Sequence, residues 1–224
     1  MSSFPIRSRA FPPNWPMRLI GVLFVAYTLY AMSRLDLTWA RFSIGMGEAG
    51  RFLARMWPPN FTRWELLAEG LIESVQIALL SSALGIILAL PLGLMAARNL
   101  APKPLTMLTR GFIAFCRSLH YVIVAILFVK AIGFGALAGI AALTIASVGF
   151  IAKLFAEAIE EVSMKQVEAI RATGAGPAAV ILYGILPQVA SRFLGFSLYQ
   201  LDSNLRNSTL VGIVGAGGIG GTLF

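Results

Sequence analysis

Long, mostly apolar runs alternate along the chain with shorter segments that hold most of its polar groups. An apolar helix of about 20 residues crosses a bilayer core of about 30 Å. The pattern therefore predicts an all-α integral membrane protein with about five spans, because five runs approach or reach this length. They are residues 19–33, 74–97, 112–129, 131–152 and 189–211.

The first run, 19–33, is short for a complete crossing, and we expect Arg18 and Arg34 to extend it by snorkelling to the interfaces. An alternative stays open. Arg7 and Arg9 before an apolar run that ends in small residues also fit a cleavable signal peptide.

The second run is rich in small residues, which predicts close contact with other helices. Pro91 lies inside this run, and we expect it to bend the helix without ending it, because the apolar sequence continues beyond it. The small residues of the run are Ser81, Ser82, Ala83, Gly85 and Gly93.

Composition agrees with a membrane protein, since 58% of the residues are hydrophobic, 12% are charged and the mean hydropathy is +0.80. A soluble domain usually has about a quarter of charged residues, so a water-soluble globule is excluded. The net charge of +8 comes mostly from basic residues beside apolar runs, which favours membrane orientation over nucleic-acid binding. A cytoplasmic N-terminus places nine basic residues inside and six outside, so this orientation is favoured.

Residues 34–73 mix five arginines with five acids and contain the break Pro58-Pro59-Asn60. This composition indicates an extramembrane connector with interfacial helices. We therefore divide the chain at about residue 68. Residues 1–68 hold an N-terminal tail, the first transmembrane helix and a periplasmic connector, and residues 69–224 hold the membrane core.

The sequence does not favour an enzyme or a metal site. One cysteine, Cys116, and one histidine, His120, cannot form an intrachain disulfide or a Cys/His zinc cage. Residues 215–220 fit G-x-G-x-x-G, but a dinucleotide site needs a following helix and an acid about twenty residues later. Ser118 is too close to His120 in sequence for a nucleophile and base on one helix, and no hydrolase motif is present.

A segment between the last two runs has the helix-ending and helix-starting residues of a helical hairpin. Residues 157–173 favour a helix, Gly174 suits a left-handed cap, and Pro177 suits the first turn of a second helix that ends before Pro187. Two short helices with a tight turn would present a rigid knob to a partner. An ordinary helix-turn-helix link is the alternative.

Five residues of this hairpin resemble the EAA loop of ATP-binding-cassette (ABC) importer permeases, whose pattern is E-A-A, three residues, G, nine residues, I, one residue and L-P. The residues that match in register are Glu168, Ala169, Gly174, Leu186 and Pro187. Two positions depart from the pattern, because Ile170 stands where a second Ala is usual and Gly184 where the Ile is usual.

The resemblance extends from about residue 69 to the end of the chain. Residues 117–143, 153–161 and 204–220 are similar to the phosphonate-transporter branch of these permeases. Similar permeases continue into a further apolar helix after the glycine run. The expected sixth span is therefore missing or truncated, is supplied elsewhere, or is replaced by a re-entrant segment at residues 212–221.

The resemblance implies the transmembrane domain of a type I ABC importer in a bacterial inner membrane. It implies a permease homodimer within membrane lipid, a periplasmic substrate-binding protein and two cytoplasmic ABC ATPase subunits. The loop at about residues 160–187 would couple the permease to these subunits. ATP and Mg would be bound by the ATPases, so no cofactor is expected in this chain.

Polar residues at membrane depth mark an expected substrate pathway. Arg206 could bind an anionic phosphonate or phosphate through its guanidinium, with Asn204 and Ser208 on the same face. The alternative is a structural pair between Arg206 and Asp202, four residues apart. Arg117 is the other pathway candidate, and its alternative is snorkelling to the cytoplasmic interface.

Arg117 and His120 lie three residues apart, so we expect both to project to one side of the third span. Phosphonate, phosphate and phosphite are not separated by the sequence. A related importer of another small solute, such as an amino acid, and a non-transporting membrane scaffold are the remaining alternatives.

Overall fold

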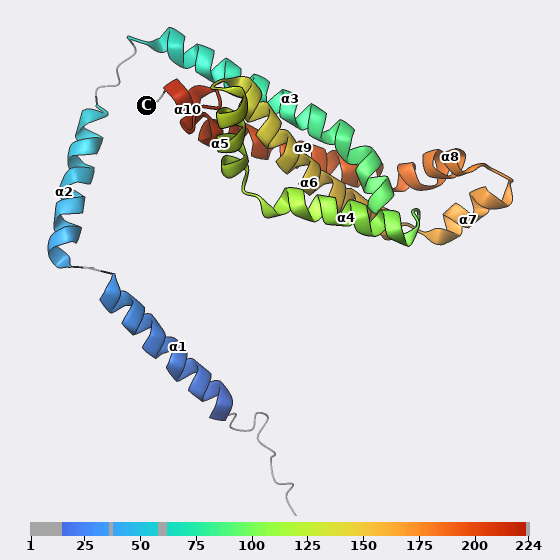
Figure 1. The fold of residues 1–224 in the computed structure, drawn as a ribbon, viewed down its shortest axis with the longest axis horizontal. Coiled ribbons are helices and arrows are strands. Elements are labelled where there is room, and N and C mark those ends of the chain that lie inside the picture. The colour runs from blue at the N-terminus through green and yellow to red at the C-terminus, as the bar shows by residue number, and fades with distance from the viewer. Residues whose placement is uncertain (1–14, 36–37, 58–61, 223–224) are drawn as a thin grey trace, which may run out of the picture. The chain divides into compact units, whose positions relative to one another are not determined.

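The computed structural model describes residues 15–35, 38–57 and 62–222, and every regular element in these ranges is helical. The expected all-α class is therefore confirmed (Figure 1). The elements are α1 (Trp15–Arg34), α2 (Trp39–Arg55), α3 (Trp64–Ala96), α4 (Lys103–Ser118), α5 (Tyr121–Ile132), α6 (Ala136–Glu160), α7 (Met164–Ala172), α8 (Pro177–Ala179), the π-helical segment η1 (Val180–Ile185), α9 (Leu186–Ile213) and α10 (Ile219–Thr222).

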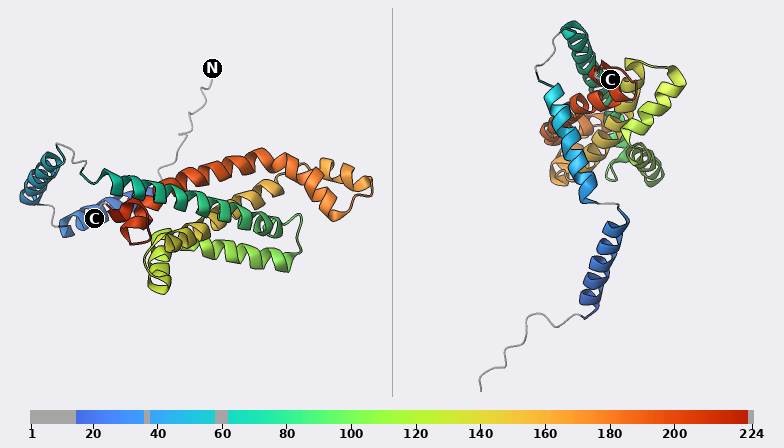
Figure 2. Two further views of the ribbon diagram at one scale, coloured as in Figure 1. Left: turned by 90° about the horizontal axis from the view of Figure 1, so that it is seen from above. Right: turned by 90° about the vertical axis from the view of Figure 1, so that its left-hand side faces the viewer.

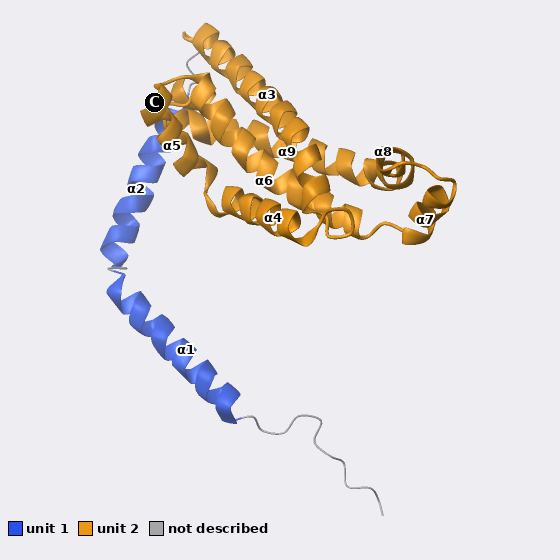
Figure 3. Cartoon of the chain, turned by 45° about the vertical axis from the view of Figure 1, so that its right-hand side comes forward, with its two compact units in different colours: residues 1–61 blue, residues 62–224 orange. Residues whose placement is uncertain are grey.

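The chain divides into two compact units, residues 1–61 and residues 62–224 (Figure 3). The first unit contains α1, an apolar helix whose side chains are nearly all exposed, and α2, whose side chains are all exposed. Exposed apolar side chains on a helix of this length suit a lipid environment. Arg7 and Arg9, and the break at residues 58–60, lie outside the described residues.

The number of spans agrees with the sequence. Within the described residues, four helical stretches are long and apolar enough to cross a membrane, and the number is five if a bent pair of helices forms one span. The four stretches are α1, α3, α6 and the continuous helical segment Pro177–Ile213, and the bent pair is α4 with α5.

The expected third span, residues 112–129, is wrong as a single helix. The chain breaks at Leu119 and His120, which have extended backbone angles, and α4 and α5 meet at 87°. The Nδ1 atom of His120 accepts a hydrogen bond from the backbone N–H of Val122 at 3.4 Å, which caps the start of α5. Arg117, Ser118 and His120 make this part of the run polar, and the His120 cap marks the start of the second helix.

Other helix boundaries also differ from the expected spans. Helix α3 begins ten residues earlier than expected and continues through Pro91 as one helix of 33 residues. Helix α6 ends at Glu160, so Lys153 lies within it and not in a separate polar segment. Hydropathy marks only the apolar part of a helix, whereas charged residues can continue the helix beyond the membrane core.

Helices α3, α6 and α9 pack along one another and form the core of the second unit (Figures 1 and 2). Four of the five small residues singled out in α3 are buried, and Ala83 is exposed. A Cβ atom on Gly85 would lie 2.4 Å from the Cβ atom of Ser147 on α6. Glycine at this position therefore allows the two backbones to approach, as the sequence predicted.

The glycine-rich segment after α9 turns back onto the start of α3. Gly215, Gly217 and Gly218 have positive φ angles between 81° and 87°. The N–H of Gly218 donates to Glu73 Oε2 at 2.9 Å, and the next N–H donates to Ser74 Oγ at 2.8 Å. The glycines thus permit close backbone approach.

Candidate functional site

The predicted hairpin is present at one end of the second unit, away from α5 and α10 (Figure 1). Helix α7 ends at Ala172, Gly174 has a φ angle of +80°, and Pro177 occupies the first turn of α8. The left-handed glycine and the proline at a helix start are confirmed. The segment consists of one short helix, α7, joined by a tight turn to the helical stretch that begins at Pro177.

The second short helix does not end before Pro187, so that expectation was wrong. Helix α8 continues through η1 directly into α9, and Pro187 lies in the first turn of α9. Proline lacks an N–H and its ring clashes with the carbonyl four residues earlier in a regular helix. A wider π-helical turn before Pro187 relieves this conflict and lets the helix continue.

The hairpin is attached firmly to the membrane helices. Val167 of α7 is fully buried in a cluster with Phe155, Ile185 and Val189, among other apolar residues. Gln188 adds two hydrogen bonds, because its Oε1 accepts from the N–H of Ser163 at 3.0 Å and its Nε2 donates to the carbonyl of Gly184 at 2.6 Å. The hairpin is therefore a rigid extension of α6 and α9.

The five residues that match the EAA pattern occupy two levels of the hairpin. Glu168, Ala169 and Gly174 are exposed on α7 and its turn, where a partner can reach them. Leu186 is half-buried and Pro187 is exposed, and both lie at the root of the hairpin. The first three therefore lie on the exposed side of the hairpin, and the last two lie where it joins α9.

The two departures from the EAA pattern lie against each other. A Cβ atom on Gly184 would lie 3.3 Å from Cδ1 of Ile170 and 3.7 Å from the Cα atom of Val167. The larger side chain at 170 thus occupies space that the smaller residue at 184 leaves open. The two substitutions compensate each other in volume, which preserves the packing of α7 on η1.

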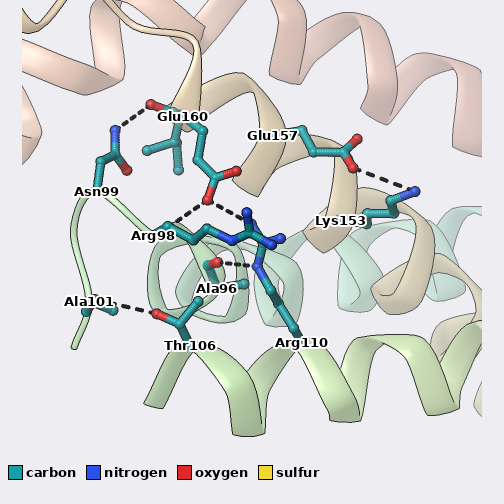
Figure 4. A network of polar contacts seen from close by, with 10 residues as sticks. Ala96, Arg98, Asn99, Ala101, Thr106, Arg110, Lys153, Glu157 and Glu160 are labelled. Carbon is teal, nitrogen blue, oxygen red and sulfur yellow. Dashed lines mark hydrogen bonds and ion pairs between the residues drawn. The ribbon is translucent and has the colours of Figure 1, made fainter. Parts of the chain in front are cut away.

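A carboxylate beside the hairpin joins three helices (Figure 4). Glu160 Oε1 accepts from the backbone N–H of Arg98 at 2.7 Å and from Arg110 Nη2 at 2.6 Å. Arg110 Nε also donates to the carbonyl of Ala96 at 2.9 Å, and Asn99 Nδ2 donates to the carbonyl of Ile159 at 2.8 Å. These contacts connect the end of α3 and helix α4 to the last turn of α6.

Sequence reasoning missed Glu160. A usable signal was present, because no acid occurs between Arg98 and Arg110 to balance these basic residues. The nearest acids after them in the chain begin at Glu157. Nothing in the sequence, however, indicated that Glu160 of α6 would contact Arg110, which lies 50 residues earlier in the chain.

Asn204 is the centre of a buried polar cluster between α3, α6 and α9. Its Nδ2 donates to Ser82 Oγ at 2.9 Å and to Ser147 Oγ at 2.8 Å. Gln200 Nε2 donates to Asn204 Oδ1 at 3.0 Å and to Ser147 Oγ at 3.1 Å. All four side chains are buried, so the cluster holds the three helices together by hydrogen bonds.

Arg206 lies on the other face of α9, and the expectation that it shares a face with Asn204 and Ser208 was wrong. Asn204 and Ser208 are fully buried, whereas Arg206 is exposed and bonds Asp202 through Nη2 and Oδ2 at 2.5 Å. Positions two residues apart on an α-helix point about 200° apart, which separates Arg206 from both neighbours. The proposed pair between Asp202 and Arg206 is present.

Arg117 and His120 do not share a helix face, because the helix breaks between them, but both line one cavity beside the break. Arg117 lies in the last turn of α4, and its side chain packs on α6. A Cβ atom on Gly149 would lie 2.8 Å from Arg117 Cγ, so glycine leaves room for this side chain. The described residues contain no cluster of three or more His, Cys, Asp or Glu side chains suited to a metal ion.

Comparison with known proteins gives a consistent picture. Residues 89–224 match the family described as binding-protein-dependent transport system inner membrane component. The chain is 39% identical over 225 residues to the phosphate-import permease protein PhnE of Mycolicibacterium smegmatis, which covers 99% of this chain and 41% of the relative. It is 40% identical over 177 residues to the phosphite transport system permease protein PtxC of Stutzerimonas stutzeri, which covers 79% of this chain and 64% of the relative.

A third relative, the putative cryptic phosphonate transport system permease protein PhnE2 of Escherichia coli K12, is 52% identical over 83 residues, which cover 37% of this chain and 68% of the relative. The chain thus spans less than two thirds of the length of the first two relatives. Among solved structures, an inward-facing MetNI methionine ABC transporter matches with a TM-score of 0.64 and 26% identity, covering 71% of this chain and 79% of that chain.

Proposed function

Because the chain belongs to the family of binding-protein-dependent transport system inner membrane components, we propose that this ABC importer permease subunit translocates phosphonate-type anions. The observation that carries the substrate class is the agreement of the three relatives. Their names refer to phosphate, phosphite and phosphonate, which share a tetrahedral phosphorus oxyanion. Selection among these anions is assigned to a separate periplasmic binding protein.

The hairpin is the proposed contact with the ATPase. Its exposed surface of Glu168, Ala169 and Gly174 lies on a rigid base, so a push from a partner would reach α6 and α9 without being absorbed in a loop. Two ATPase subunits would bind and hydrolyse ATP with Mg, and this chain would supply no catalytic residue.

The distribution of charge supports a cytoplasmic position for the hairpin. Basic residues gather in α7, around the α3–α4 loop and in the adjoining halves of α4 and α6, at one end of the second unit. Segments on the cytoplasmic side of membrane proteins carry an excess of lysine and arginine. The residues concerned are Arg98, Lys103, Arg110, Lys153, Lys165 and Arg171.

The predicted pathway role of Arg206, Arg117, Asn204 and Ser208 stays a prediction. The four residues differ in exposure. Arg206 and Arg117 are exposed, so a solute can reach them more readily than the buried Asn204 and Ser208. We expect Arg206→Ala to lower transport more than Arg206→Lys, since Lys keeps the charge. Equal, wild-type transport in both variants would assign Arg206 to its structural pair with Asp202.

Reconstitution tests the proposed function. The permease, as a homodimer with its ATPase subunits in proteoliposomes, should hydrolyse ATP faster when a binding protein loaded with methylphosphonate is added. Phosphite and phosphate in place of methylphosphonate rank the anions, and D-methionine serves as the control solute. Stimulation by D-methionine without stimulation by any phosphorus oxyanion would overturn the substrate assignment.

A further inference from the structure

Two cavities lie along the groove between α4 and α6. The first has a volume of about 300 Å³, and its charged lining residues are Arg110, Arg117, Lys153 and Glu157. The second has a volume of about 340 Å³ and is lined by Arg117 together with residues of the α4–α5 break and of α6. Arg117 lines both cavities, so its side chain marks the point where they adjoin.

The charges around the first cavity are not balanced. Three cations line it against one carboxylate. Lys153 Nζ lies 3.5 Å from Glu157 Oε1, and Arg110 is bonded to Glu160, so these two cations already have partners (Figure 4). Among the described residues, no acceptor forms a hydrogen bond or ion pair with the Arg117 guanidinium.

These groups follow one side of α6 from its C-terminal end toward the middle of the helix. Glu160, Glu157, Lys153 and Gly149, against which Arg117 packs, lie within 11 residues, which correspond to about 16 Å of helix. Charged groups within a membrane helix are costly unless they face a cavity or each other. Here the charged residues line a cavity, and two of the cations also have carboxylate partners, so the groove is polar.

We propose that Arg117, with Arg110 and Lys153 beside it, forms a binding site for a tetrahedral phosphorus oxyanion in this groove. The inference rests on the proposed function and specifies where the anion rests inside the permease. The guanidinium of Arg117 offers parallel N–H donors that match two oxygens of a phosphonate or phosphate. Glu157 and Glu160 offset the other two cations, so binding is weak, as release from a transport site requires.

The phosphodiester of an anionic lipid offers the same oxyanion chemistry. Binding of inorganic phosphate to the permease and ATPase complex in detergent tests the site without lipid competition. We expect Arg117→Gln to weaken phosphate binding by about tenfold or more, because charged hydrogen bonds are lost. Arg117→Lys should restore part of the affinity, since it keeps the charge without the fork.

Lys103→Gln is the matched control, because it removes the same charge from α4 but does not line either cavity. It should leave phosphate binding unchanged. Arg117→Gln must keep the elution volume and thermal unfolding of the wild-type complex, which shows that its loss of binding is local. Equal phosphate binding by wild type and Arg117→Gln, in a folded complex, would overturn a site for the transported anion.

Native mass spectrometry from nanodiscs identifies a lipid source. Wild-type complex in phosphatidylcholine with phosphatidylglycerol would retain phosphatidylglycerol, and Arg117→Gln would lose it, if the occupant is a lipid headgroup. Absence of both phosphate binding and selective phosphatidylglycerol retention overturns the inference. Methylphosphonate uptake is measured separately, so failed uptake with intact phosphate binding would reject the proposed function and leave the site standing.

Discussion

Ile170 and Gly184 both depart from the family pattern, and they pack against each other, so the larger residue at one position is matched by the smaller residue at the other. A Cβ atom at position 184 would lie 3.3 Å from Ile170 Cδ1, so the larger residue usual at this position requires the Ile170 side chain to shift. Overpacking a tight contact costs about 1–3 kcal/mol. The two positions are therefore expected to couple energetically.

We predict that Gly184→Ile lowers the thermal stability of the purified permease, and that adding Ile170→Ala restores most of the loss. Unfolding in detergent, followed by a thermal-shift assay, measures both variants and the Ile170→Ala single change. Gly195→Ile serves as the control, because a Cβ at Gly195 meets no heavy atom within 4 Å. Additive effects of the two changes would contradict the compensation.

The environment of individual polar residues was the part of the site least accessible from sequence. Asn204, Arg206 and Ser208 all read as polar groups at membrane depth, but only two of them face neighbouring helices. The periodicity of α9 fixes the angle between these side chains and not the direction in which α3 and α6 lie. Glu160 was missed for a related reason, since its partner Arg110 is 50 residues away.

At the scale of elements, the hairpin turn depends on Gly174. Its φ angle of +80° is strained for any residue with a side chain and impossible for proline. We predict that Gly174→Pro leaves membrane insertion intact and abolishes transport, and that Gly174→Ala lowers transport partially. Uptake in proteoliposomes and permease abundance in the membrane are the two measurements.

Gly176 provides the control for that prediction. It has a φ angle of −69°, and a Cβ on it would meet no atom within 4 Å. Gly176→Ala should therefore transport like wild type. Wild-type uptake by Gly174→Pro would show that the turn does not transmit movement from an ATPase.

The buried cluster around Asn204 holds α3, α6 and α9 together. We predict that Asn204→Leu destabilises the permease by about 1–2 kcal/mol, because Ser82, Ser147 and Gln200 lose their shared partner. Asn207→Leu is the comparison, since Asn207 is half-buried and makes one bond, to Ser203 at 3.2 Å. Equal thermal stability of the two variants would contradict a central role for the cluster.

Helices with long apolar runs or distinctive end residues were predicted well, and the α4–α5 break was not. Gly174 and Pro177 predict the hairpin from sequence because the backbone conformations that glycine and proline favour depend on the residue itself and not on distant contacts. Arg117, Ser118 and His120 interrupt the apolar sequence at the α4–α5 break, but the apolar residues on both sides are enough to suggest one continuous span. The side chain of His120 caps the start of α5, and α5 runs at 87° to α4. Both facts are seen only in the structure.

At the scale of the whole molecule, the predicted coupling requires the hairpin to face the cytoplasm. Cys116 is the one native cysteine of the chain and is buried, so its replacement by Ala gives a background for labelling. In this background we predict that Glu168→Cys reacts with a membrane-impermeant maleimide only when the reagent reaches the cytoplasmic side.

Lys130→Cys reports on the opposite end of the second unit, because Lys130 is exposed in the last turn of α5. It should react from the periplasmic side. Labelling of Glu168→Cys from the periplasm would separate the hairpin from any cytoplasmic ATPase and reject the importer assignment.

The position of Glu160 has a consequence for how movement spreads. This carboxylate ends α6 just before the hairpin, yet it is bonded to Arg98 and Arg110 on the α3–α4 side. If an ATPase moves the hairpin, as proposed, the bonds of Glu160 would pass part of that movement to α4, the helix that carries Arg117. The same helix would then receive the movement and carry the proposed anion site. A movement of α4 would therefore weaken the binding of the anion.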